Sequence, residues 1–157
     1  MNTALKVASL VAALSLGSPV SAAKALSITT AMASYNGNRA YAVVYIVDSR
    51  GKYIGTIYAA GQRAKYFSHM SRWHRMFSRS GRGVDGTTGA SVGSGQSFST
   101  TMNIPDTLIN AGYVLRIETV VENQRYFPKD VSIPIDNAHN GKIVFGNGYV
   151  DTAIIKY

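Results

Sequence analysis

Cysteine is absent from this chain of 157 residues, and acidic side chains are scarce. Without cysteine the fold can hold no disulfide, and it can offer neither a thiol nucleophile nor a thiolate metal ligand. Stability must therefore come from packing, for which ten Tyr, five Phe and one Trp supply large side chains. The length fits one ordinary domain with a hydrophobic core of its own.

The chain also lacks an apolar run long enough to cross a bilayer, whose hydrocarbon core is about 30 Å thick. Its amino end instead resembles a secretory leader. A short basic segment precedes the apolar stretch 7–16, and Val20-Ser21-Ala22 places small residues where a signal peptidase cuts. We therefore expect residues 1–23 to be a signal peptide that is cleaved near Ala22 or Ala23, and the mature protein to be periplasmic or otherwise exported.

Acidic residues are missing altogether between Asp48 and Asp85, a stretch that holds eight Arg and Lys side chains. The whole chain carries a formal net charge of +8. Such a bias bears on partners and encounter rates rather than on fold. Nucleic acid is not the expected partner of an exported protein. We expect an anionic membrane surface, a phosphate-bearing ligand or an acidic protein, with a merely solvated basic face as the alternative.

Short apolar segments separated by turn residues predict an all-β fold. Tyr41–Val47 is apolar at nearly every position, as in a central strand buried on both faces, and a short turn joins it to Lys52–Tyr58 as a hairpin. Further strands are expected at Leu26–Ser34, Gln96–Ile104, Tyr113–Val121, Val131–Ile135, Gly141–Phe145 and Tyr149–Ile155, with a turn at Pro128–Asp130. Their spacing indicates that residues 24–157 form a single Ig-like antiparallel β-sandwich.

The segment Tyr66–Arg79 has a different period. Its apolar side chains Phe67, Met70, Trp73 and Phe77 recur at the spacing of one helix face, with the arginines turned away. This pattern predicts one amphipathic helix of about three to four turns. The helix would be inserted after the third strand, with Trp73 packed against the sheet.

Patterns that would indicate catalysis or metal binding are scarce. The histidines are His69, His74 and His139; the first two are five residues apart, which does not place both rings on one helix face. No acid lies in their segment to complete a metal site. Glu118 and Glu122 are expected on the solvent face of a strand. No serine lies in a nucleophile elbow, so a hydrolase is not indicated. We therefore expect neither catalytic residues nor a metal site.

One segment rich in glycine and hydroxyl groups, Asp85–Ser91 (DGTTGAS), is a candidate site. The same residue types form ordinary surface loops, so a loop without chemistry is the alternative. Gly86 and Gly89 would let the backbone turn tightly and present successive N–H groups, which can hold phosphate oxygens. Ser91 offers a hydroxyl with no base nearby in the sequence, so its activation would have to come from a partner enzyme.

The heptapeptide resembles the flavinylation motif, Asp-x-x-Ser/Thr-Gly-Ala-Ser/Thr, which ApbE-type flavin transferases recognise outside the cytoplasmic membrane. In proteins with this motif, FMN is joined through its phosphate to the hydroxyl of the last Ser or Thr. The resemblance implies that Ser91 accepts a covalent FMN, within a motif completed by Asp85, Thr88, Gly89 and Ala90. The usual acceptor is Thr, and the hydroxyl of Ser91 offers the same chemistry.

A longer resemblance covers roughly Leu26–Tyr157. The hairpin, the aromatic and basic segment with Trp73, and DGTTGAS follow one another as in a family of exported proteins known only as a domain of unknown function. These proteins are often associated with PepSY-type membrane proteins and are implicated in flavin-based electron transfer. The segment after Ser91, VGSGQSF, departs from the family pattern, which has a basic residue and Pro-Gly there.

This longer resemblance implies an extracytoplasmic flavoprotein that carries electrons to or from a membrane redox partner through its covalent FMN. The alternative is a non-catalytic periplasmic binding or structural module that uses its basic face to hold a partner. A module of that kind would carry no flavin on Ser91.

Overall fold

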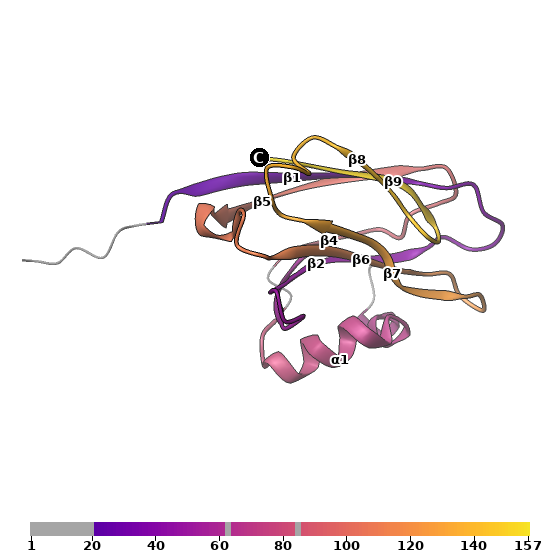
Figure 1. Ribbon diagram of the computed structural model, residues 1–157. Helices are drawn as coiled ribbons and strands as arrows, with labels where there is room; N and C mark the ends of the chain where they lie inside the picture. Colours follow the sequence, from indigo (N-terminus) through magenta and orange to yellow (C-terminus); the bar gives the residue numbers. More distant parts are fainter. Residues whose placement is uncertain (1–20, 62–63, 84–85) are drawn as a thin grey trace, which may run out of the picture.

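The computed structural model describes residues 21–61, 64–83 and 86–157. Most of the predicted signal peptide, residues 1–20, therefore lies outside the described residues. Figure 1 shows three layers: two stacked β-sheets, with the helical segment covering the outer face of one of them. None of the helices in the described ranges is long and apolar enough to cross a membrane.

Within the described residues, the two sheets have four and five strands. The four-stranded sheet has the order β5-β1-β9-β8 and consists of β1 (Ala23–Met32), β5 (Ser97–Pro105), β8 (Ile143–Phe145) and β9 (Val150–Lys156). The five-stranded sheet has the order β4-β3-β2-β6-β7 and consists of β2 (Tyr41–Val47), β3 (Tyr53–Ala60), β4 (Thr87–Gly89), β6 (Val114–Val120) and β7 (Tyr126–Pro134). A short 3₁₀ helix, η2 (Asp106–Leu108), follows β5. The predicted all-β, Ig-like sandwich with an inserted helical segment is confirmed. The pairing of β3 with β4 is parallel, so the sandwich is not antiparallel throughout.

The central strand β2 is buried on both faces, as its unbroken apolar sequence predicts. Ala42, Val44 and Ile46 face the core between the two sheets. The alternate side chains, such as Val43 and Tyr45, belong to a second core beneath the helical segment. Because successive side chains of a strand point to opposite faces, burial on both sides requires a layer on each side of the sheet.

The segment predicted as one helix is divided in two. A 3₁₀ helix, η1 (Ala64–His69), precedes the α-helix α1 (Ser71–Ser80), and Met70 between them has φ −92° and ψ +67°, which is not helical. The apolar stripe itself is confirmed, because Met70 and Trp73 are fully buried against the sheet. The indole N–H of Trp73 also donates to the Thr56 hydroxyl at 2.9 Å, so this ring belongs to the core.

The helix α1 begins at Ser71 because the sheet supplies partners for its first N–H groups. No side chain at its own N-terminus caps it. Instead the N–H of Trp73 donates to the Glu118 carboxylate at 3.2 Å, and the N–H of Arg72 donates to the Tyr126 hydroxyl at 2.9 Å. The first N–H groups of any helix lack partners within the helix. Two side chains on neighbouring strands therefore fix where α1 starts. They also account for the interruption of the helical segment at Met70.

Glu118 is fully buried under α1, so the prediction that it faces solvent is wrong. Its carboxylate also accepts hydrogen bonds from the hydroxyl groups of Tyr45 at 2.6 Å and Tyr126 at 2.5 Å. An alternating strand sequence cannot reveal that a distant helix covers its polar face. Glu122, the other predicted surface acid, lies beyond the end of β6 and is half-buried.

The segment Pro128–Asp130, predicted as a turn, lies inside β7. Because β7 is at the edge of its sheet, a proline within it breaks no pairing on the outer side. Asp130 is fully buried and holds the turn between β8 and β9. Its carboxylate accepts the N–H groups of Asn147, Gly148, Tyr149 and Val150 at 2.8–3.0 Å, and also the Thr119 hydroxyl.

Burial raises the pKa of Glu118 above its ordinary value, although the hydrogen bonds from Tyr126, Tyr45 and Trp73 oppose that shift. The native state then binds the proton more tightly than the unfolded chain. Relative to the non-titrating variant Glu118→Gln, the unfolding free energy of the wild type should therefore fall as pH rises from about 4 through the raised pKa. Urea unfolding of both proteins across this range measures the difference. A stability difference between the two proteins that does not change with pH, or that grows as pH rises, would contradict the raised pKa of Glu118.

Candidate functional site

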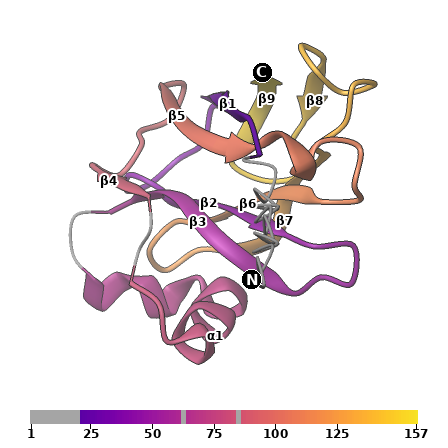
Figure 2. The same ribbon diagram turned by 90° about the vertical axis from the view of Figure 1, so that its left-hand side faces the viewer.

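The segment Gly86–Ser91 is not the open loop that its composition predicts. Its middle forms the edge strand β4, in which Thr87, Thr88 and Gly89 pair in parallel with Tyr58, Ala59 and Ala60 of β3. Figure 2 shows β4 beside β3 at the margin of the five-stranded sheet. Both threonine side chains are exposed. Asp85, the first residue of the predicted motif, lies outside the described residues.

Gly86 and Gly89 are required by close packing and not, as predicted, by an unusual backbone conformation. Neither has a positive φ. A Cβ at Gly86 would lie 1.9 Å from the carbonyl oxygen of Ile57, and one at Gly89 would lie 2.1 Å from the Tyr58 hydroxyl. A side chain at Gly86 would therefore push β4 away from the backbone of β3, whereas one at Gly89 would displace the Tyr58 side chain.

Ser91 follows β4 and is half-buried. Within the described residues its hydroxyl makes no hydrogen bond, and neither a histidine nor a carboxylate is bonded to it. The adjacent Val92 forms a β-bridge with Ala40, which holds this end of the segment against the start of β2. The arrangement presents a hydroxyl group from a fixed backbone, with no base bonded to it among residues 21–61, 64–83 and 86–157.

Arg39 is a neighbour of Ser91 that sequence reasoning missed. Its Nε donates to the Ser91 carbonyl oxygen at 2.8 Å, and its terminal nitrogen donates to Gln96 Oε1 at 3.0 Å. The two residues are 52 positions apart, and no local pattern around Arg39 signals the contact. A cation is thereby held beside the serine.

An aromatic cluster lies at the same end of the sheet as Ser91. The N–H of Gly61, just after β3, donates to the Gly89 carbonyl oxygen at 2.8 Å. The ends of β3 and β4 therefore lie side by side. The Tyr41 ring lies against Gly61 and stacks on Tyr66, with 5.0 Å between ring centroids. The Lys65 amine sits 4.9 Å from the Tyr66 centroid.

The basic segment forms an exposed surface on α1. Arg75, Arg79 and Arg82 are exposed, and Arg72 is half-buried. Among the described residues the only ion pair joins His139 to Asp136, on the opposite layer. Arg75, Arg79 and Arg82 therefore form no ion pair with a carboxylate in the described part of the chain, whereas the charge of Arg72 acts on the buried carboxylate of Glu118. His69 and His74 form no metal site there either, since no three potential ligands converge within the described ranges.

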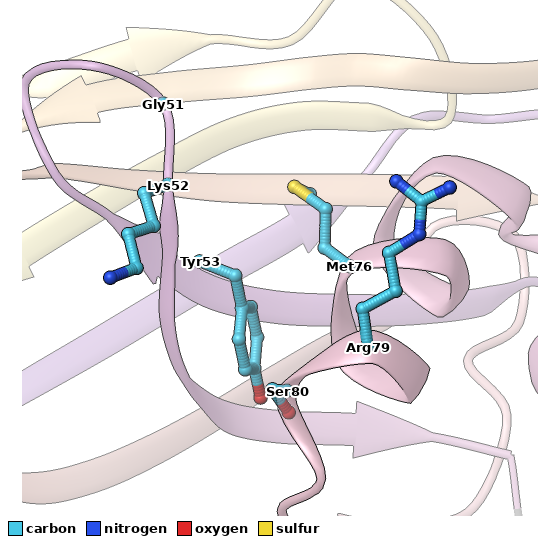
Figure 3. A pocket seen from close by; sticks show the side chains of 6 residues that line it. All are labelled: Gly51, Lys52, Tyr53, Met76, Arg79 and Ser80. Carbon is cyan, nitrogen blue, oxygen red and sulfur yellow. The ribbon is translucent and has the colours of Figure 1, made fainter.

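A separate hollow of about 280 Å³ lies between the β2–β3 turn and the C-terminal half of α1. Figure 3 shows its lining residues, with Met76, Arg79 and Ser80 on the helix facing Gly51, Lys52 and Tyr53 on the turn and strand. This hollow lies at the end where β3 begins, whereas Ser91 lies beyond the end where β3 finishes. The two sites are therefore distinct.

Residues 23–152 match the sequence profile of a family described as predicted periplasmic protein, DUF2271. The match begins where β1 begins and ends within β9, so it spans both sheets and the helical segment. No curated protein and no solved structure shows significant similarity to the chain.

The packing of β4 predicts a graded response to alanine at three glycines. Gly86→Ala should destabilise most, because it clashes with backbone atoms of β3, and Gly89→Ala should cost about 1–3 kcal/mol because only a tyrosine side chain must move. Gly83→Ala is the matched control, since a Cβ there meets nothing within 4 Å. Thermal unfolding of the three variants measures the order of their stabilities. Equal stability of the Gly86 and Gly83 variants would contradict the pairing of β4 with β3.

Proposed function

This chain belongs to that family of periplasmic proteins, and we propose that it is an electron carrier whose FMN is attached covalently to Ser91. The observation that carries the proposal is the position of the Ser91 hydroxyl. Ser91 is half-buried and follows a strand fixed by close packing, and its hydroxyl makes no hydrogen bond within the described residues. It is also the last residue of a segment that resembles a flavinylation motif, in which Thr88, Gly89 and Ala90 precede it.

The residues around Ser91 suit a phosphoester. In its formation the Ser91 oxygen bonds to the FMN phosphorus of an activated flavin nucleotide. The bond from that phosphorus to the nucleotide leaving group breaks, and the hydroxyl proton passes to a base of the transferase. No base is bonded to Ser91 among the described residues, which agrees with activation by a separate ApbE-type transferase. The Arg39 guanidinium, held at the Ser91 carbonyl, supplies a cation for the phosphate.

FMN supplies the redox chemistry when it is bound. The chain's own part is to hold the flavin at a sheet edge next to the stacked rings of Tyr41 and Tyr66, and to keep it from diffusing away. Trp73 takes no part, because its side chain is fully buried in the core beneath α1. The uncompensated arginines of α1 would attract an acidic redox partner, such as a PepSY-type membrane protein, or an anionic membrane surface.

Intact mass of the mature protein tests the attachment. Wild-type protein from a periplasm with an active flavin transferase should gain one FMN less one water, and Ser91→Ala should not. Thr87→Ala is the matched control, because it removes an exposed hydroxyl at a variable position of the same segment and should still be modified. An unmodified wild-type mass from such a host would refute the carrier function and leave the basic-faced binding module.

The attraction of an acidic partner should make electron exchange depend on salt. The rate between the flavin-bearing protein and a PepSY-type partner should fall about tenfold or more as ionic strength rises from about 0.01 to 0.15 M. Arg75→Gln should lower the rate at low salt, whereas Lys129→Gln, an exposed cation on β7, should not. Stopped-flow absorbance of the flavin measures both. A rate that is independent of salt would exclude steering by this surface.

A further inference from the structure

The outer face of the four-stranded sheet carries an exposed apolar patch on its edge strand β8. Among the described residues, the large apolar side chains that remain exposed are Ile143, at 59%, and Phe145, at 72%. Both alternate with Val144, which packs against the core, so they share the outward face of the strand. On β9 the half-buried Ile154 pairs with Ile143 and extends the patch. Exposed apolar side chains gathered on one face mark an interaction site.

The rest of this face is built from small, uncharged side chains. The residues of β1 and β5 that alternate with the core residues are Ala, Ser, Thr, Asn and Pro. Two pairs of hydroxyl groups bond across the strands, Ser27 with Thr101 at 3.1 Å and Ser99 with Thr29 at 3.2 Å. Because these hydroxyl groups already have partners, a second surface laid over them leaves fewer polar groups unsatisfied.

One charge of each sign lies on the outward side of β9. Lys156 alternates outward with Ile154 and is exposed. Asp151 is exposed at the other end of the strand, where the register with β1 shifts. Neither side chain forms an ion pair in the part of the chain that the structure describes. A surface that binds anionic lipid carries a cluster of Lys and Arg, whereas the outward charges of these four strands balance.

The exposed arginines lie on the opposite side of the molecule. Figures 1 and 2 both show α1 beyond the five-stranded sheet, on the side away from β8 and β9. Two copies that meet through their four-stranded sheets therefore keep their basic α1 layers at the two far ends of the assembly. Self-association of a chain with net charge +8 is opposed by repulsion, and this face is where that repulsion is smallest.

We propose that two copies of this chain associate face to face through their four-stranded sheets as a two-fold symmetric dimer. A two-fold axis that lies between the sheets and crosses β9 near Ala153 brings Lys156 of each copy to Asp151 of the other. The same axis brings Ile143 of each copy to Phe145 of the other, because these residues lie on either side of the Ala153 level. The dimer does not involve Ser91 and needs no flavin.

The size of the face sets the expected affinity. The four strands cover roughly 500 Å² in projection, at about 3.4 Å per residue and about 4.8 Å between strands. A standard interface buries about 800 Å² on each partner. The dimer should therefore be weak, with a dissociation constant on the order of 10–100 µM.

Sedimentation equilibrium of the mature protein tests the association. At an ionic strength of about 0.15 M, the weight-average mass should rise from one chain toward two between about 1 µM and about 1 mM protein. Ile143→Ser and Phe145→Ser should each raise the dissociation constant at least about tenfold, because each removes apolar area from the interface. Both side chains are exposed in the single chain, so both variants should fold. A wild type that stays monomeric at about 1 mM would overturn the proposal.

Charge exchange on β9 tests the two-fold arrangement. Lys156→Asp and Asp151→Lys should each weaken the dimer about three- to tenfold, since like charges then meet in two symmetric contacts. The double variant should recover the wild-type dissociation constant to within about twofold. Lys52→Asp, on the turn between β2 and β3 of the other sheet, changes the net charge as much as Lys156→Asp does and should have less than about a twofold effect. No recovery in the double variant, or an equal loss in Lys52→Asp, would contradict the arrangement.

A lipid surface is the competing occupant of this face. Cosedimentation with vesicles of phosphatidylcholine and phosphatidylglycerol should be the same for the wild type and Phe145→Ser, because Phe145 contacts a second copy and not lipid. Loss of vesicle binding in Phe145→Ser, with no change in the dissociation constant of the dimer, would overturn the proposal and assign the patch to a membrane.

Discussion

The buried carboxylate of Glu118 joins the helical layer to the sheet, and the rest of the structure depends on this junction. It receives hydroxyl hydrogen bonds from two strands and the N–H of Trp73 from α1. With α1 fixed there, the outward face of β2 is covered and can be apolar. The chain then returns from α1 to the edge of the same sheet as β4, which sets the position of Ser91. A single acid therefore links the second core, the start of the helix and the candidate site.

The parts of the fold that depend on side-chain periodicity were predictable from the sequence. The central strand Tyr41–Val47 has the predicted bounds, and the apolar stripe of the helical segment does face the sheet. The parts that depend on one buried polar group were not. Glu118 alternates with apolar neighbours like a surface residue, and Pro128-Lys129-Asp130 has the composition of a turn. Both acids are buried because distant N–H groups need them as acceptors, which no local pattern expresses.

The candidate site shows the same division. Its hydroxyl-bearing segment was identified from composition and motif. The strand β4 was not, since three residues beside glycines are too short to show the alternating pattern of a strand. The glycines were expected to allow unusual dihedral angles, whereas the structure needs them because β3 approaches so closely. Arg39 was missed because its contact with Ser91 bridges segments far apart in sequence. A short motif can thus identify a reactive side chain without revealing what surrounds it.

The four-stranded sheet has a consequence for how the protein is assembled after export. Among the described residues β1 is the first strand in sequence, and it pairs on one side with β5 and on the other with the last described strand, β9. A chain that enters the periplasm amino end first delivers β1 long before its partner β9. The four-stranded sheet can therefore form completely only after Lys156 has arrived, and until then the edge of β1 that pairs with β9 has unpaired N–H and C=O groups. Folding of this domain is thereby tied to the export of its last paired strand, β9.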